Sequence, residues 1–210
     1  MSTRTQAQHA RTRLSAKHAW FFVLGAMTLF ILYHDERFIF FHKSGTWKYF
    51  YPVRWKLFVH ALGGATALVL GASQFSTRLR RWRPSLHRLL GRFYIGGVLV
   101  SAPMAVYLSF THGLRILSVE VTVQASLWVV TALMALLAAR NRSFQVHEQW
   151  MMRSYAVTLI FVISRIVFEL PGLSGMSDVS AEHVLWILII CALLVPQLII
   201  NWRSLTHPSL

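Results

Sequence analysis

Cysteine is almost missing from this sequence. The only one among 210 residues is Cys191, which lies inside an apolar stretch. A single cysteine excludes an intramolecular disulfide and any metal site built on cysteine pairs. We interpret Cys191 as a small apolar packing residue.

Charged residues are also scarce. They make up 13% of the chain, about half of the ~25% that is typical of soluble domains, whereas 55% of the residues are hydrophobic. Several apolar windows reach about 18 residues or more, which is long enough to cross a bilayer as a helix. The composition therefore predicts an all-α, polytopic integral membrane protein.

Six transmembrane helices are predicted, each with ends uncertain by about three residues. The predicted spans are 18–33, 56–75, 88–110, 122–139, 147–170 and 183–201. They form one membrane domain, 18–201, between a basic tail, 1–17, and a short tail, 202–210. The connection 34–55 is rich in aromatic residues, so we expect it to lie among the lipid headgroups.

Acidic residues number only seven against 21 basic ones, which gives a net charge of +14. The basic residues lie in short loops between apolar spans, where insertion topology accounts for them, so we exclude nucleic acid as a partner. With both termini in the cytoplasm, thirteen basic residues fall inside and six outside. The positive-inside rule thus predicts that both termini lie in the cytoplasm, and we expect the protein to contact the bilayer and its anionic headgroups.

Four polar side chains within the spans stand out, because polar groups inside a bilayer are costly. His87 and His147 open two helices that run in the same direction, so we expect them at one depth. His60 and Arg165 each lie about one turn from the opposite membrane face. The helices therefore predict two polar levels.

Small or polar residues share the helix faces of the three histidines. They leave room for a flat ligand beside an imidazole, although small residues also simply let helices pack closely. The candidate ligand-binding residues are His60, His87, His147, Arg165, Gly64, Gly91, Tyr94 and Ser154.

Two imidazoles at one depth on two helices suit a b-type haem, so His87 and His147 are the candidate metal ligands. Arg88, Arg92 and Arg153 could neutralise the propionates. Two alternatives remain open for the pair, namely a lipid phosphate and a zinc ion. Zinc needs a third ligand, and Glu148 should point away from its neighbour His147 on a helix.

Other functions also remain open. Arg165 could clamp a quinone or a propionate near His60, or it could pair with Glu169 one turn further on. Without a redox cofactor, the histidines and Arg165 could form a proton or small-anion path. The chain could also be an assembly subunit of a larger membrane complex. The sequence does not decide whether the protein is an enzyme.

Three sequence blocks resemble a family of predicted bacterial membrane proteins classified only as a domain of unknown function. They are HALGGATALVLGASQF, LHRLLGRFY and HEQWMMRSYA followed by an arginine, and they span roughly residues 56–170. One departure is Glu148, where the family pattern has a basic residue. The resemblance implies a multi-pass protein of the bacterial inner (cytoplasmic) membrane and one common site, but no established activity.

The helix pattern is also similar, more loosely, to transmembrane di-haem b cytochromes of the ascorbate-reducible kind. That resemblance implies that His87 and His147 hold one haem. His60 would be half of a second haem site, but the predicted fourth helix, 122–139, has no histidine to complete it.

Overall fold

The computed structural model describes residues 25–26, 33, 45–112, 115–170 and 177–206. All regular structure in this part of the chain is helical, which confirms the all-α class. The elements are α2 (Gly45–Phe50), η2 (Tyr51–Val53), α3 (Arg54–Ser73), α4 (Thr77–Trp82), α5 (Pro84–Thr111), η3 (Arg115–Leu117), α6 (Ser118–Arg140), α7 (Phe144–Glu169) and α8 (Asp178–Thr206).

Among the described residues, five helices are long and apolar enough to cross a membrane. They run over Trp47–Ser73, Pro84–Thr111, Ser118–Arg140, Phe144–Phe168 and Ser180–Trp202. They match five of the six predicted spans but begin earlier, because the residues just before each predicted span are also helical. Nearly all of the predicted span 18–33 lies outside the described residues, so the count of six stays a prediction.

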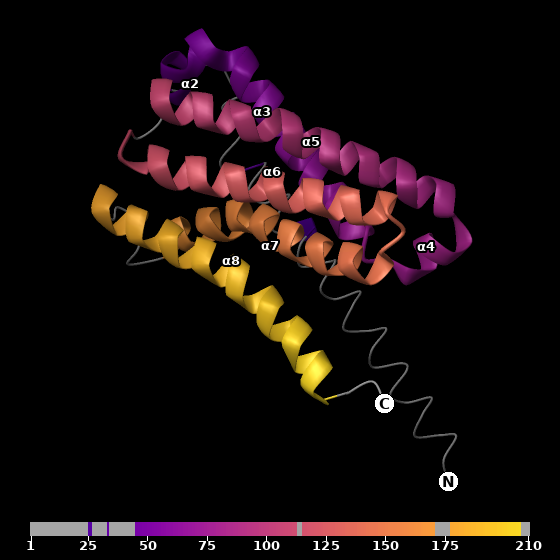
Figure 1. The fold of residues 1–210 in the computed structure, drawn as a ribbon. Coiled ribbons are helices and arrows are strands. Elements are labelled where there is room, and N and C mark those ends of the chain that lie inside the picture. Colours follow the sequence, from indigo (N-terminus) through magenta and orange to yellow (C-terminus); the bar gives the residue numbers. More distant parts are fainter. Residues whose placement is uncertain (1–24, 27–32, 34–44, 113–114, 171–176, 207–210) are drawn as a thin grey trace.

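The long helices lie side by side in the order α3, α5, α6, α7, α8 (Figure 1). α3 also contacts α7, so α3, α5, α6 and α7 surround a common core, while α8 packs on α7 and diverges from it toward its C-terminal end. The fully buried residues of this core include Ala67, Tyr94, Val98, Ala132 and Ala135. The small side chains at three of these positions let the helices approach closely.

The connection predicted at 34–55 is described from residue 45 onward, and there it is helical. α2 and η2 lead into α3, so that Trp47–Ser73 forms one candidate span. The Tyr49 hydroxyl donates a hydrogen bond of 2.7 Å to the backbone carbonyl of His112 at the end of α5. This segment is therefore tied to the bundle by at least one direct contact.

Short, well-capped turns join the helices at the opposite end. The Ser76 hydroxyl caps α4 by accepting from the Leu79 amide at 3.2 Å, and Pro84 occupies the first turn of α5, where a missing N–H costs nothing. Between α6 and α7 the chain reverses at Arg142, which has a left-handed φ of 59°. The amide of Ser143 bonds to the Ala138 carbonyl at 2.9 Å, which closes a glycine-type helix cap without glycine.

Candidate functional site

His60 on α3 is fixed by Ser101 on α5. Its Nδ1 lies 3.0 Å from both the carbonyl oxygen and the hydroxyl oxygen of Ser101. A carbonyl only accepts, and the hydroxyl donates to the His60 carbonyl at 2.9 Å, so Nδ1 must be the donor in both contacts. The neutral ring therefore keeps its lone pair on Nε2.

A cavity of about 430 Å³ opens beside this ring, and we call it the His60/Arg165 cavity. Its walls come from α3, α5, α6, α7 and α8 as well as η3. The lining residues are His60, Ala61, Gly64, Ala65, Leu68, Ser101, Ala102, Ala105, Leu117, Val121, Gln124, Ala125, Trp128, Thr158, Phe161, Ser164, Arg165, Phe168 and Leu185. The structure thus brings together three sequence candidates, His60, Gly64 and Arg165.

The glycines of α3 have different roles. An added Cβ at Gly63 would lie 2.9 Å from the Gly97 carbonyl oxygen, and one at Gly71 would lie 2.7 Å from the Tyr155 ring, so both are required for packing. At Gly64 the nearest atom would be the Ser101 hydroxyl oxygen at an ordinary 3.5 Å. Of these three, only Gly64 borders the cavity.

Tyr94 and Ser154 line neither of the two cavities described here. Both are fully buried, and the Tyr94 hydroxyl lies 2.7 Å from the Ser154 hydroxyl and 3.2 Å from that of Thr158. The Trp128 indole N–H donates to the same Thr158 oxygen at 2.9 Å. The structure places these two candidates in a hydrogen-bonded core joining α5, α6 and α7, where they act on the helix packing.

His87 and His147 line a second cavity, of about 890 Å³, which we call the His87/His147 cavity. Gly91 lines it too, one turn from His87. The full set is Gln74, Arg80, Pro84, His87, Arg88, Gly91, Arg92, Ile95, Leu136, Ala139, Arg140, Phe144, Gln145, His147, Glu148 and Met151. Four arginines and one carboxylate make this wall strongly basic.

The two imidazoles of this cavity are held differently. His147 Nδ1 donates to the Ala135 carbonyl at 2.8 Å, which leaves the Nε2 lone pair of the neutral ring for a ligand. His87 Nδ1 is buried and has no hydrogen-bond partner among the described residues. Such a nitrogen costs about 1–3 kcal/mol, a cost that a bound group could recover.

Glu148 was predicted to point away from its neighbour His147 on the helix. It lines the same wall as His147 and lies 3.9 Å from Arg80 of α4. A step of 100° along a helix still leaves two neighbours on the rim of so wide a cavity. Even so, no three histidine, cysteine or acidic side chains cluster as a metal site in the described ranges, so the zinc alternative has no ligand set there.

Arg153 lies apart from both cavities. Its guanidinium donates to the Gln197 side chain of α8 at 2.6 Å and lies 4.9 Å from the centre of the Trp150 ring. It ties α7 to α8, away from the site where it was predicted to meet a propionate. Two arginines absent from that prediction, Arg80 and Arg140, do line the His87/His147 cavity.

Two features of these sites were not predicted from the sequence. Gln124 and Trp128 on α6 border the His60/Arg165 cavity. They are four residues apart on one helix face, a signal that a search restricted to histidine did not detect.

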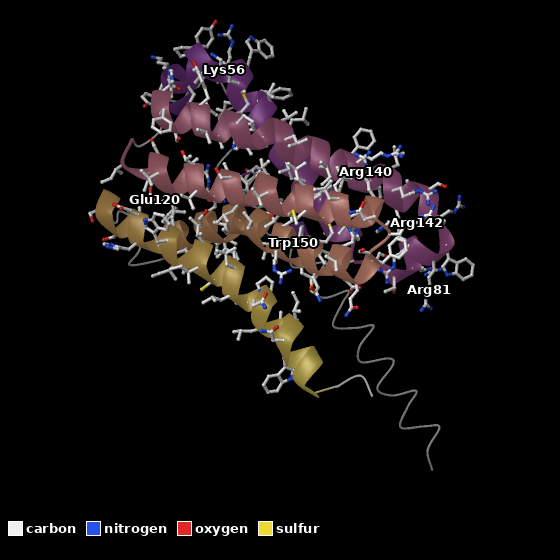
Figure 2. The ribbon with its side chains drawn as sticks, in the orientation of Figure 1. Lys56, Arg81, Glu120, Arg140, Arg142 and Trp150 are labelled. Atoms are coloured by element: carbon white, nitrogen blue, oxygen red, sulfur yellow. The ribbon has the colours of Figure 1, made fainter. Side chains whose placement is uncertain are left out.

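Charge is distributed unevenly over the bundle. Arg81, Arg140 and Arg142 lie at the end that carries α4, and Lys56 and Glu120 lie at the opposite end (Figure 2). Arg80 of α4 lines the His87/His147 cavity, so this cavity with its four arginines lies at the basic end.

These features define the class: an integral membrane protein made of a helical bundle with two cavities. The chain belongs to a family described as a predicted membrane protein, DUF2306, whose model matches residues 57–202. No curated protein and no solved structure matches it. The family membership confirms the resemblance found in the three sequence blocks, but it brings no activity and no support for the cytochrome resemblance.

Proposed function

We propose that the protein binds a b-type haem in the His87/His147 cavity and serves one-electron transfer within the membrane. The observation that supports this most is that two imidazoles, from α5 and α7, line one cavity together with four arginines. Bis-histidine ligation requires one neutral nitrogen from each of two side chains. The cavity lies within the range of about 300–1,000 Å³ that is usual for small-molecule and cofactor sites.

The residues present suit this group in their chemistry. The Nδ1–H of His147 is held by a carbonyl, as is usual for metal-ligating histidines. Arg88, Arg92 and Arg140 offer cations to the propionates, while the apolar wall includes Ile95, Leu136 and Met151. The haem would supply a one-electron redox couple, and the chain would hold it, set its orientation and exclude water.

The test is an absorption spectrum of the purified protein in mild detergent, oxidised and then reduced with dithionite, with the haem quantified. We expect a Soret band that sharpens on reduction and about one haem per chain. His87→Ala and His147→Ala should each lose it. His183→Ala is the matched control, because His183 is an exposed histidine of α8 that lines neither cavity. A colourless protein from haem-replete cells, or haem retained in both variants, would refute the proposal.

A second candidate ligand for this cavity is an anionic lipid phosphate, favoured by Arg80, Arg88, Arg92 and Arg140. Guanidinium groups bind phosphate oxygens through paired hydrogen bonds. This candidate predicts a colourless protein that retains added phosphatidylglycerol in native mass spectrometry. Replacing Arg88 and Arg92 by Gln should release the lipid, whereas Arg142→Gln, at the same end but not in the cavity wall, should not.

A further inference from the structure

We propose that the His60/Arg165 cavity is a second, separate binding site, for a planar aromatic ligand that has a hydroxyl group at one end of the ring and a second oxygen, able to accept a hydrogen bond, at the other. A quinol head group is the membrane-soluble form of this chemistry, because it has one hydroxyl at each end of the ring. The inference concerns binding alone, and it does not depend on a haem in the other cavity.

The two walls of the cavity suit a flat ring. α3 and α5 contribute residues with side chains no larger than a methyl group, namely Ala61, Gly64, Ala65, Ala102 and Ala105. α6 and α7 contribute three aromatic side chains, namely Trp128, Phe161 and Phe168. A planar ligand can lie against the small-residue wall and contact the aromatic rings by stacking or edge contacts.

His60 supplies the hydrogen-bond acceptor. Because both Ser101 oxygens accept from its Nδ1–H, the neutral ring presents a bare Nε2. Nε2 can accept a hydrogen bond from a ligand hydroxyl, whereas its lone pair would repel a carbonyl oxygen. A ligand hydroxyl is therefore the complementary group at this position.

Donors come from the neighbouring helices. The Arg165 guanidinium lines the cavity from α7, with its central carbon 5.5 Å from the centre of the Phe161 ring. The Gln124 amide lines it from α6. A guanidinium donates to oxygen acceptors, so a quinol can donate one hydroxyl to His60 and accept at its second oxygen from Arg165.

Size and polarity limit the alternatives. A cavity of about 430 Å³ suits a one-ring head group but lies at the small end of the range for small-molecule sites. A bare inorganic anion would leave the aromatic and alanine walls without contacts.

The fully buried Tyr94 and Ser154, which line neither cavity, contribute to the packed core that joins α5 and α7.

The experiment measures equilibrium binding of a short-tailed benzoquinone, 2,3-dimethoxy-5-methyl-6-decyl-1,4-benzoquinone, and of its quinol to the full-length protein in detergent. Gly64→Leu fills the cavity from the α3 wall, and Arg165→Gln removes the cation but keeps an amide. Gly96→Leu is the matched control, because no described atom lies within 4 Å of a Cβ at Gly96 and this glycine lines neither cavity.

We expect saturable binding of the quinol to the native protein and to Gly96→Leu, and weaker binding of the quinone, which has no hydroxyl to donate to His60. Binding should be at least about tenfold weaker in Arg165→Gln, the usual effect of losing a hydrogen bond to a charged group, and lost in Gly64→Leu. If Gly64→Leu does not fold, Arg165→Gln decides the question.

Two results would overturn the inference: no saturable binding by the native protein, or equal binding by the native protein and Arg165→Gln. Haem content is measured on the same samples. A colourless protein that binds the quinol refutes only the haem proposal, and a haem protein that ignores the quinol refutes only this one.

Discussion

Two adjacent glycines of α3 provide a sharp test of the packing. Gly63 faces α5, where an added Cβ would lie 2.9 Å from the Gly97 carbonyl oxygen and 3.1 Å from Ser101 Cβ. Gly64 borders the His60/Arg165 cavity, and its Cβ would make only an ordinary contact. Replacing each by alanine adds the same methyl group to the same helix one position apart.

The expected effects have opposite signs. Backbone and buried Cβ atoms cannot move aside as a flexible side chain would, so Gly63→Ala should cost about 1–3 kcal/mol of overpacking. For a chain of this size, that lowers the unfolding midpoint by about 2–12 °C. Gly64→Ala should instead gain up to about 0.5–1 kcal/mol from reduced backbone freedom, because nothing opposes the methyl group.

The assay is thermal unfolding in one detergent, followed by tryptophan fluorescence, with Gly96→Ala as the exposed reference. No described atom lies within 4 Å of a Cβ there, so this variant reports helix propensity alone. Gly63→Ala should unfold below the native protein, and Gly64→Ala should match Gly96→Ala.

Equal unfolding temperatures for Gly63→Ala and Gly64→Ala would contradict this packing. So would a Gly64→Ala variant that is the less stable of the two. Either outcome would mean that α3 and α5 do not cross where Gly63 faces Gly97, and the position of His60 against Ser101 would fail with it.

The remaining predictions are tested by the same thermal-unfolding assay or by fusing a reporter protein to the C-terminus. Tyr94→Phe should lower the midpoint by about 2–5 °C, because it removes two intramembrane hydrogen bonds worth about 0.6 kcal/mol each. Arg142→Gly should raise stability by about 1 kcal/mol, because glycine adopts the left-handed backbone without strain. In ligand-free protein, His147→Ala should be less stable than His87→Ala, because only His147 Nδ1 has a hydrogen bond to lose among the described residues. A C-terminal green fluorescent protein fusion should fluoresce and an alkaline phosphatase fusion should be inactive; the reverse would contradict cytoplasmic termini.

The membrane class and five of the spans could be predicted from the sequence, because an apolar run of about 18 residues or more is seldom found outside a membrane-spanning helix. Helix starts could not be predicted accurately. The residues before the apolar run, from Pro84 to His87, include Ser85 and His87, yet α5 begins with them because the proline fits its first turn. The helical start of α2 was also missed, since its aromatic residues suit a headgroup segment equally well.

The pairing of polar residues was partly predictable. Depth along each helix predicted His87 with His147 and His60 with Arg165, and each pair does line one cavity. Depth alone could not say which way a neighbouring residue turns, so it did not show that Glu148 borders the same cavity as His147, or that Arg153 lies outside it. Nor could it separate Gly63, which packs, from Gly64, which borders a cavity, because they differ only in which neighbour each faces.

The same hydrogen-bonding arrangement holds one histidine at each cavity. His60 and His147 each donate Nδ1–H to a backbone carbonyl of a neighbouring helix, at Ser101 and Ala135. Both carbonyls belong to small, fully buried residues, so each imidazole ring can come close to the backbone of the neighbouring helix. An imidazole held in this way has a defined tautomer and orientation before any ligand arrives, which lowers the entropic cost of binding. His87 Nδ1 lacks such a contact among the described residues. The two cavities are therefore unequal: the single histidine of one is held by a backbone carbonyl, whereas the other pairs an imidazole held in this way with one whose buried Nδ1 has no described partner.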